Sequence, residues 1–205
     1  MHAWRRVAAL TTLALALGLA TAACSDSKSD SGGQVSVFTT RPENPLNPLA
    51  TTEVGGGRII RSMFTGLTSA DPDTAEMKNA MAESIETTDS QNYTIALKRG
   101  WKFHDGSEVK AKNFVDAWNY AAYTPNGMQN APFYENIEGF DQVHTIDPDQ
   151  EGPEQAPTPP SEKMSGLEII DDYTFKVKLT SPLSIFTTKI SYVAFYPMPD
   201  VFFTN

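Results

Sequence analysis

A short apolar segment lies near the N-terminus of this 205-residue chain and is followed by a mostly polar sequence. Arg5 and Arg6 precede an apolar run over residues 7–19, and residues 20–23 are all small. This order of positive, apolar and small residues is typical of a secretory signal peptide. A membrane-spanning helix needs about 20 apolar residues, and the polar residues 25–33 do not extend the run. We therefore predict that residues 1–23 are a signal peptide of the general secretory type and not a transmembrane anchor.

Cys24 follows directly after this segment and is the only cysteine in the chain. A single cysteine excludes an internal disulfide and any zinc site that needs two thiolates. The sequence Thr21-Ala22-Ala23-Cys24 resembles a bacterial lipobox, although Thr21 departs from the usual Leu or Val. The resemblance implies a diacylglyceryl group on the Cys24 thiol, and two or more acyl chains hold a protein stably on a membrane. We predict lipid anchoring through Cys24, the alternative being an incidental cysteine beside the cleavage site.

The residues after the anchor and the overall charge describe a water-soluble body on a tether. Residues 25–33 contain no apolar side chain and predict a flexible tether over 24–33.

The chain has 16 Lys and Arg against 25 Asp and Glu, a net charge of −9, and removing Arg5 and Arg6 gives −9 − 2 = −11. No basic patch offsets this charge, so a nucleic-acid partner is excluded. We expect a monomer.

Hydrophobic patterning predicts a mixed α/β fold with antiparallel strand pairs. Apolar and polar residues alternate in segments that we expect to be strands, whereas apolar residues at spacings of three and four indicate helices. The expected strands are 34–39, 93–97, 101–103 leading into an Asp105-Gly106 turn, and 174–179; the expected helices are 58–64, after a loop at 55–57, and one carrying Phe114, Val115, Trp118, Ala121 and Ala122. Residues 147–163 hold five prolines and five acids, which predicts an exposed loop.

Catalytic and metal-binding patterns do not emerge from these residues. His104 and His144 have no Gly-x-Ser-x-Gly nucleophile or catalytic cysteine to serve, and His104 flanks a turn. Asp171 and Asp172 are adjacent on the chain, which fits a turn better than a general acid and base pair. The acidic stretch 147–154 lacks the order of a calcium loop, and the glycines at 55–57 lack the Lys and Ser or Thr of a P-loop. We predict no enzyme, no cofactor and no metal site.

Six motifs in a fixed order resemble the oligopeptide- and dipeptide-binding proteins of ABC importers, family 5 of the extracellular solute-binding proteins. They are Met63-Phe-Thr-Gly-Leu-Thr68, Met81-Ala-Glu-Ser-Ile85, Tyr93-Thr-Ile-Ala-Leu-Lys-Arg-Gly100, Lys102-Phe-His-Asp-Gly-Ser107, Asn113-Phe-Val-Asp-Ala-Trp118 and Gly166-Leu-Glu-Ile-Ile-Asp-Asp-Tyr-Thr174. Each motif alone is modest, but their shared order over about residues 34–199 makes the resemblance specific.

The resemblance implies a periplasmic-binding-protein-like fold of type II, with two lobes and an inserted subdomain. Residues 34–62 would be the first segment of the ligand-binding lobe, 63–180 the inserted subdomain, and 181–205 the return to that lobe. Members of the family are more than twice as long, so we expect only the N-terminal part of the fold, as a fragment or from a truncated gene.

The resemblance also implies a function outside the cell. The protein would capture extracellular oligopeptides, deliver them to an ABC permease in the membrane, and stay anchored to the outer face of the cell membrane. Two alternatives remain open: the same fold binding a non-peptide solute such as a nickel chelate, or a lipid-anchored structural or signalling protein without transport.

Ligand contacts in the family map to the segment before the first helix, here Thr52, Val54, Gly55 and Gly56. The glycines either admit a ligand backbone or form a flexible link from strand to helix. Where many relatives carry an aromatic residue, this chain has Asp116, which either meets a ligand amine or faces solvent.

Overall fold

The computed structural model describes residues 36, 38–149 and 156–204 of the chain. Two units separate, Met1–Phe38 and Thr39–Asn205, and the description below concerns the second. The predicted signal peptide, the Cys24 anchor, the tether and the middle of the acidic loop lie outside the described residues. Of the strand expected at 34–39, the described Ser36, Phe38 and Thr39 have irregular backbone, so the strand prediction is wrong for these residues.

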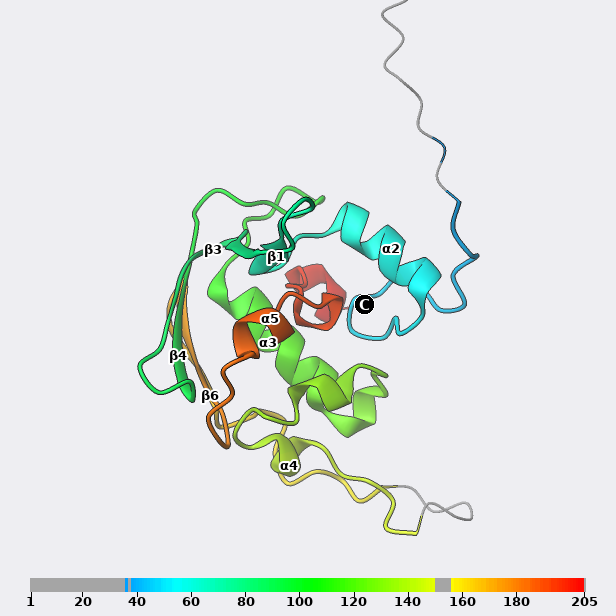
Figure 1. Cartoon of the computed structure of the whole chain (residues 1–205). Helices are drawn as coiled ribbons and strands as arrows, with labels where there is room; N and C mark the ends of the chain where they lie inside the picture. Colours follow the sequence, from blue (N-terminus) through cyan, green and yellow to red (C-terminus); the bar gives the residue numbers. More distant parts are fainter. Residues whose placement is uncertain (1–35, 37, 150–155, 205) are drawn as a thin grey trace, which may run out of the picture. The chain divides into compact units, whose positions relative to one another are not determined.

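A four-stranded antiparallel sheet forms one side of the unit (Figure 1), in the order β3-β4-β6-β5. Its central strands are the two that the alternation predicted, and Tyr93 pairs with Val177 and Ile95 with Phe175. These four side chains are buried, while their neighbours along each strand are more exposed. The strands are β3 (Ala82–Glu86), β4 (Asn92–Leu97), β5 (Leu167–Asp171) and β6 (Thr174–Lys178), with a separate hairpin of β1 (Thr68–Ala70) and β2 (Met77–Asn79).

The helix predicted from Phe114 onward is α3 (Ala111–Ala122), and it packs against the sheet. The ring of Phe114 stacks on Phe175 of β6 at 5.8 Å, and Trp118 meets the same ring edge-on at 5.7 Å. Lys110 is a poor N-cap residue, and the Asn113 side chain compensates by accepting the Lys110 N–H at 2.8 Å. The other helical segments are α2 (Val54–Met63), α4 (Phe140–Val143), α5 (Phe186–Lys189) and four short 3₁₀ turns (Thr124–Asn126, Ala131–Tyr134, Val193–Phe195 and Asp200–Phe203).

The three glycines at 55–57 lie inside α2, so the loop expected there is wrong and the helix begins at Val54 rather than Arg58. Glycine disfavours a helix by about 1 kcal/mol relative to alanine, which is why sequence patterning places the start too late. Glu53 offsets part of this cost because its carboxylate caps the helix, accepting the Gly56 N–H at 2.6 Å.

Buried donors fasten the C-terminal segment to the core. The indole N–H of Trp118 donates to the Phe195 carbonyl at 3.1 Å, and the Tyr134 hydroxyl donates to the Ala194 carbonyl. The Asn113 amide donates to the Met198 carbonyl at 3.0 Å. The hydrophobic core contains residues from all three predicted segments, 34–62, 63–180 and 181–205. The assignment of these segments to a ligand-binding lobe and an inserted subdomain stays a prediction.

The predicted strand and turn at 101–106 and the predicted acidic loop at 147–163 both differ in part from expectation. At the Asp105-Gly106 turn, Phe103 N–H donates to Ser107 O at 2.9 Å and Gly106 has φ +86°, but pairing extends only to a single Lys102–Glu108 bridge, so the strand expected at 101–103 is wrong. In the acidic loop most described residues are exposed, whereas Pro159 is buried and Ser161 N–H donates to Gln142 O at 3.0 Å. Within the described part of the chain, every helix is too short or too polar to cross a bilayer.

Candidate ligand-binding site

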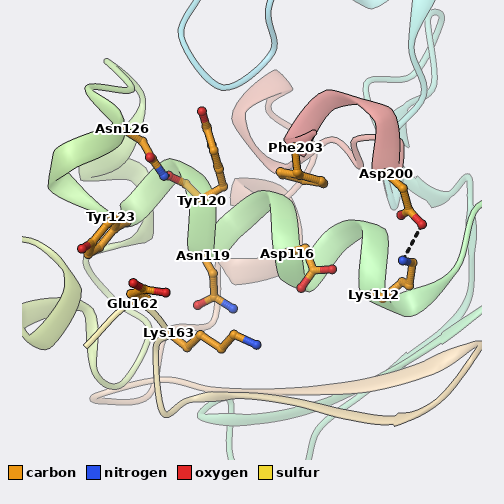
Figure 2. A pocket seen from close by; sticks show the side chains of 10 residues that line it. All are labelled: Lys112, Asp116, Asn119, Tyr120, Tyr123, Asn126, Glu162, Lys163, Asp200 and Phe203. Carbon is orange, nitrogen blue, oxygen red and sulfur yellow. Dashed lines mark hydrogen bonds and ion pairs between the residues drawn. The ribbon is translucent and has the colours of Figure 1, made fainter. Parts of the chain in front are cut away.

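The outward face of α3 forms the wall of a cavity of about 580 Å³ (Figure 2). Phe114, Ala117, Trp118 and Ala121 bury the inner face of the helix. Because residues three and four apart share a helix face, the remaining positions line up on the other side. They are Lys112, Asp116, Asn119, Tyr120 and Tyr123, and the cavity is completed by Asn126, Glu162, Lys163, Asp200 and Phe203.

Charges in this cavity are paired on one side only. The Lys112 ammonium lies 2.6 Å from the Asp200 carboxylate, which also accepts the Asn113 amide at 3.1 Å. The half-buried Asp116 carboxylate, one turn along the helix from Lys112, has no hydrogen bond or ion pair with any residue that the structure describes. Glu162 and Lys163 bring one further charge of each sign and are both exposed.

Asn119 supplies a fixed polar group at the base of the cavity. The residue is 6% exposed, and its Oδ1 accepts the Met164 N–H at 2.8 Å. That bond assigns the oxygen to the protein side, so the Nδ2 group is left for the cavity. Among the described residues Nδ2 has no hydrogen-bond partner.

Aromatic rings line the cavity next to these polar groups. Tyr120 meets Phe203 edge-on at 5.5 Å and Phe202 at 5.3 Å, so its ring is held in place. Tyr123 lies half-buried near the Glu162 side of the cavity (Figure 2). A concave space with apolar rings and a few convergent polar groups is the usual form of a small-ligand site.

The ligand contacts expected before the first helix lie outside this cavity. Thr52 and Val54 are exposed, and the Thr52 hydroxyl lies 3.3 Å from Gln129 Oε1. Gly55 and Gly56 are buried, and a Cβ atom there would lie 2.5 Å from Thr40 O and 2.3 Å from Glu53 Oε1 respectively. Close packing within the protein is thus enough to explain glycine at these two positions. A ligand contact at Thr52, Val54, Gly55 and Gly56 stays a prediction.

A second cavity, of about 680 Å³, lies between α2, β1 and residues 188–196. Its lining includes Arg61, Lys189 and the rings of Phe133 and Tyr192, which stack at 4.5 Å. Lys189 donates to Asn136 Oδ1 at 2.5 Å, and burial lowers the pKa of its ammonium. The sequence motifs give no role to this second cavity.

The residues weighed for catalysis have structural partners. The His104 ring lies edge-on to Phe64, and the His144 ring stacks on Phe140 at 4.7 Å. Asp172 pairs with Lys110 at 2.7 Å, and its hydrogen bond raises the pKa of the Lys110 ammonium. Across the described residues no three His, Cys, Asp or Glu side chains gather as metal ligands would.

Sequence reasoning singled out Asp116 but missed the rest of the cavity. The signal on α3 was present, because polar and aromatic residues at 112, 116, 119, 120 and 123 follow helical spacing on the face opposite the apolar one. Glu162, Lys163, Asp200 and Phe203 carry no such signal, because only the tertiary fold brings them to α3.

The chain belongs to the bacterial extracellular solute-binding proteins, family 5, which it matches in their middle region over residues 76–203. It is 29% identical over 203 residues to the oligopeptide-binding protein OppA of Bacillus subtilis (strain 168), covering 93% of this chain and 35% of that protein. It is also 29% identical over 156 residues to the periplasmic oligopeptide-binding protein OppA of Escherichia coli (strain K12), covering 75% of this chain and 26% of that protein. The chain therefore spans about a third or less of the length of these relatives.

The fold is that of the periplasmic peptide-binding proteins. The structure of the Escherichia coli murein tripeptide binding protein MppA superposes with a TM-score of 0.66 at 22% identity, covering 80% of this chain and 30% of that one. The predicted family and fold class are confirmed, and the chain corresponds to part of a larger architecture in these relatives.

Proposed function

We propose that this protein is a substrate-binding lipoprotein that captures extracellular oligopeptides and delivers them to the permease of an ABC importer. The observation that carries the proposal is the similarity to the Bacillus subtilis oligopeptide-binding protein along 93% of the chain. Further support comes from a solved substrate-binding domain of an oligopeptide ABC transporter from Bacillus anthracis, which shares the fold.

The cavity on α3 supports a peptide as the ligand. A volume of about 580 Å³ lies in the range of sites for small organic ligands and accommodates an amino-acid side chain. Thr52 and Val54 stand exposed at the start of α2, where they would be accessible to a ligand backbone. A receptor that forms hydrogen bonds with the backbone of a peptide recognises peptides of many sequences, because every residue offers the same N–H and C=O groups.

Peptide capture is tested by native mass spectrometry of the full-length protein purified from its own cells. The proposal expects adducts of a few hundred daltons that denaturation releases and that fragment as peptides. Thermal shift with peptides of two to six residues gives the second measurement. A protein that carries no peptide and is stabilised only by a nickel chelate or another non-peptide solute would contradict the proposal.

Membrane anchoring is proposed to depend on the Cys24 thiol. Cells grown with labelled palmitate should incorporate the label into the wild-type protein and not into Cys24→Ser, and only the wild type should enter the detergent phase of a Triton X-114 extraction. Ser27→Ala, three residues away, is the matched control and should keep both properties. Label retained by Cys24→Ser would show that the lipid is attached elsewhere.

A further inference from the structure

The cavity on α3 carries an excess of negative charge at its least exposed point. Of its five charged side chains, Lys112 and Asp200 neutralise each other at 2.6 Å. Glu162 and Lys163 are exposed, where solvent and salt screen a charge strongly. The Asp116 carboxylate is half-buried and unpaired among the described residues, so its field is the least screened in the cavity.

The rings beside Asp116 favour a cation as well. Tyr120 follows Asp116 by one helical turn, and Phe203 contacts Tyr120 at 5.5 Å between ring centroids. Aromatic faces attract ammonium and guanidinium groups, and the attraction is stronger where water is excluded. Their apolar surface also accepts the methylene groups of a long side chain.

Asn119 gives the cavity a second, independent polar group. The residue is more than nine-tenths buried, and its Nδ2 group lacks a partner among the described residues. An amide N–H₂ group donates and cannot accept, so it matches a carbonyl oxygen. Asp116 and Asn119 are neighbours on the helix face, and together they offer an acceptor for a cation and a donor for a backbone carbonyl.

We propose that this cavity selects peptide ligands with a basic side chain, and that Asp116 is the residue that determines this preference. The proposal rests on the peptide-binding function proposed above. The Asp116 carboxylate accepts a hydrogen bond from the ammonium of a ligand lysine or the guanidinium of a ligand arginine. The Tyr120 and Phe203 rings cover the methylene groups of that ligand side chain. Asn119 Nδ2 donates to a carbonyl of the same ligand.

The test compares tripeptides that differ only in the central side chain, Ala-Lys-Ala and Ala-Arg-Ala against Ala-Met-Ala, by calorimetric titration of the full-length protein. A charge-assisted hydrogen bond predicts about tenfold tighter binding of the basic peptides by the wild type. Asp116→Asn should bind basic and neutral peptides alike. Asp141→Asn makes the same change on α4, away from the cavity lining, and should keep the preference.

A second measurement separates this proposal from peptide binding itself. Lysine amide, added at millimolar concentration to ¹⁵N-labelled protein, should shift the backbone amide signals of residues 116–123 in the wild type and not in Asp116→Asn. If no tripeptide binds but lysine amide produces these shifts, the peptide function fails and the cation site stands. Absence of the shifts in the wild type, or tripeptide binding with equal affinity for Lys and Met, would overturn the proposal. Far-UV circular dichroism verifies that each variant is folded.

Discussion

Gly55 and Gly57 lie two positions apart in the first turns of α2 but have very different surroundings. A Cβ atom on Gly55 would meet both Thr40 O and Thr40 Oγ1 at 2.5 Å, distances that require the backbone to move. A Cβ atom on Gly57 would have its nearest neighbour, the end of the Arg61 side chain, at 4.0 Å. The same residue type is thus required at one position and tolerated at the other.

We predict opposite effects for alanine at these two positions. Gly55→Ala should destabilise the protein by about 1–3 kcal/mol, because overpacking forces a shift in a close contact. Gly57→Ala should stabilise it by about 0.5–1 kcal/mol, since alanine favours the helix and restricts the unfolded chain. Urea denaturation of the two variants measures both values. Equal destabilisation by both would show that the contact with Thr40 does not matter.

At the scale of elements, the turn between β3 and β4 depends on one carboxylate. Asp89 accepts hydrogen bonds from the backbone N–H groups of Gln91 at 2.9 Å and Asn92 at 2.8 Å, and from the Asn92 side chain at 2.7 Å. These bonds, led by the backbone N–H of Asn92, hold the pKa of Asp89 well below its ordinary value. The turn also places Ser90 at φ +57°, so the side-chain bonds offset a strained backbone.

We predict that Asp89→Ala lowers the urea midpoint at pH 7 and that its difference from the wild type narrows as the pH falls. Because the pKa of Asp89 is lower in the folded protein, its stabilisation is present above the unfolded pKa of about 3.9 and is lost as the pH falls below it. Urea titrations between pH 7 and pH 2 check this dependence. Asp73→Ala, in the exposed β1–β2 turn, is the matched control and should leave the midpoint nearly unchanged. A difference that stays constant down to pH 2 would contradict the assignment.

At the scale of the whole molecule, the Tyr134 hydroxyl is fully buried and holds the Ala194 carbonyl. Tyr134→Phe leaves that carbonyl without this donor and should cost about 1–3 kcal/mol in the free energy of unfolding. Tyr120→Phe, whose hydroxyl donates to no described residue, should cost less than about 0.5 kcal/mol.

The same hydroxyl predicts a dependence on alkaline pH. Burial raises the pKa of Tyr134 above its ordinary value. A raised pKa gives stability that is present below pH 10.0, the ordinary value, and is lost as the pH rises beyond it, because only the unfolded chain releases the proton. Stability should therefore fall more steeply above pH 10 in the wild type than in Tyr134→Phe. Thermal unfolding between pH 8 and pH 11 measures the two slopes, and identical slopes would refute the prediction.

Strands β4 and β6 and helix α3 were predicted correctly because each of them buries one face along its length. Strands β4 and β6 and helix α3 lie at the centre of the fold, so their apolar spacing reports directly on the core. Strands β3 and β5 were missed because they are edge strands with little burial, and Ile169 and Ile170 are both exposed on β5. In the candidate site, Asp116 was found through the family resemblance, whereas Asp200 and Phe203 reach the cavity only by long-range packing that no local pattern encodes.

The hydrogen bond from Trp118 to the Phe195 carbonyl affects when the core can form during synthesis of the chain. Strand β4 can pair fully with β6 only after Lys178 has been synthesised. The Trp118 indole can form its hydrogen bond only after Phe195 has been synthesised. Contacts between such distant segments slow folding, because a long loop must close before they form. A chain that emerges N-terminus first therefore cannot complete this core until nearly all of the described residues have left the ribosome. Such a delay would be compatible with the extracellular location that we propose, since secretion channels thread unfolded chains across the membrane.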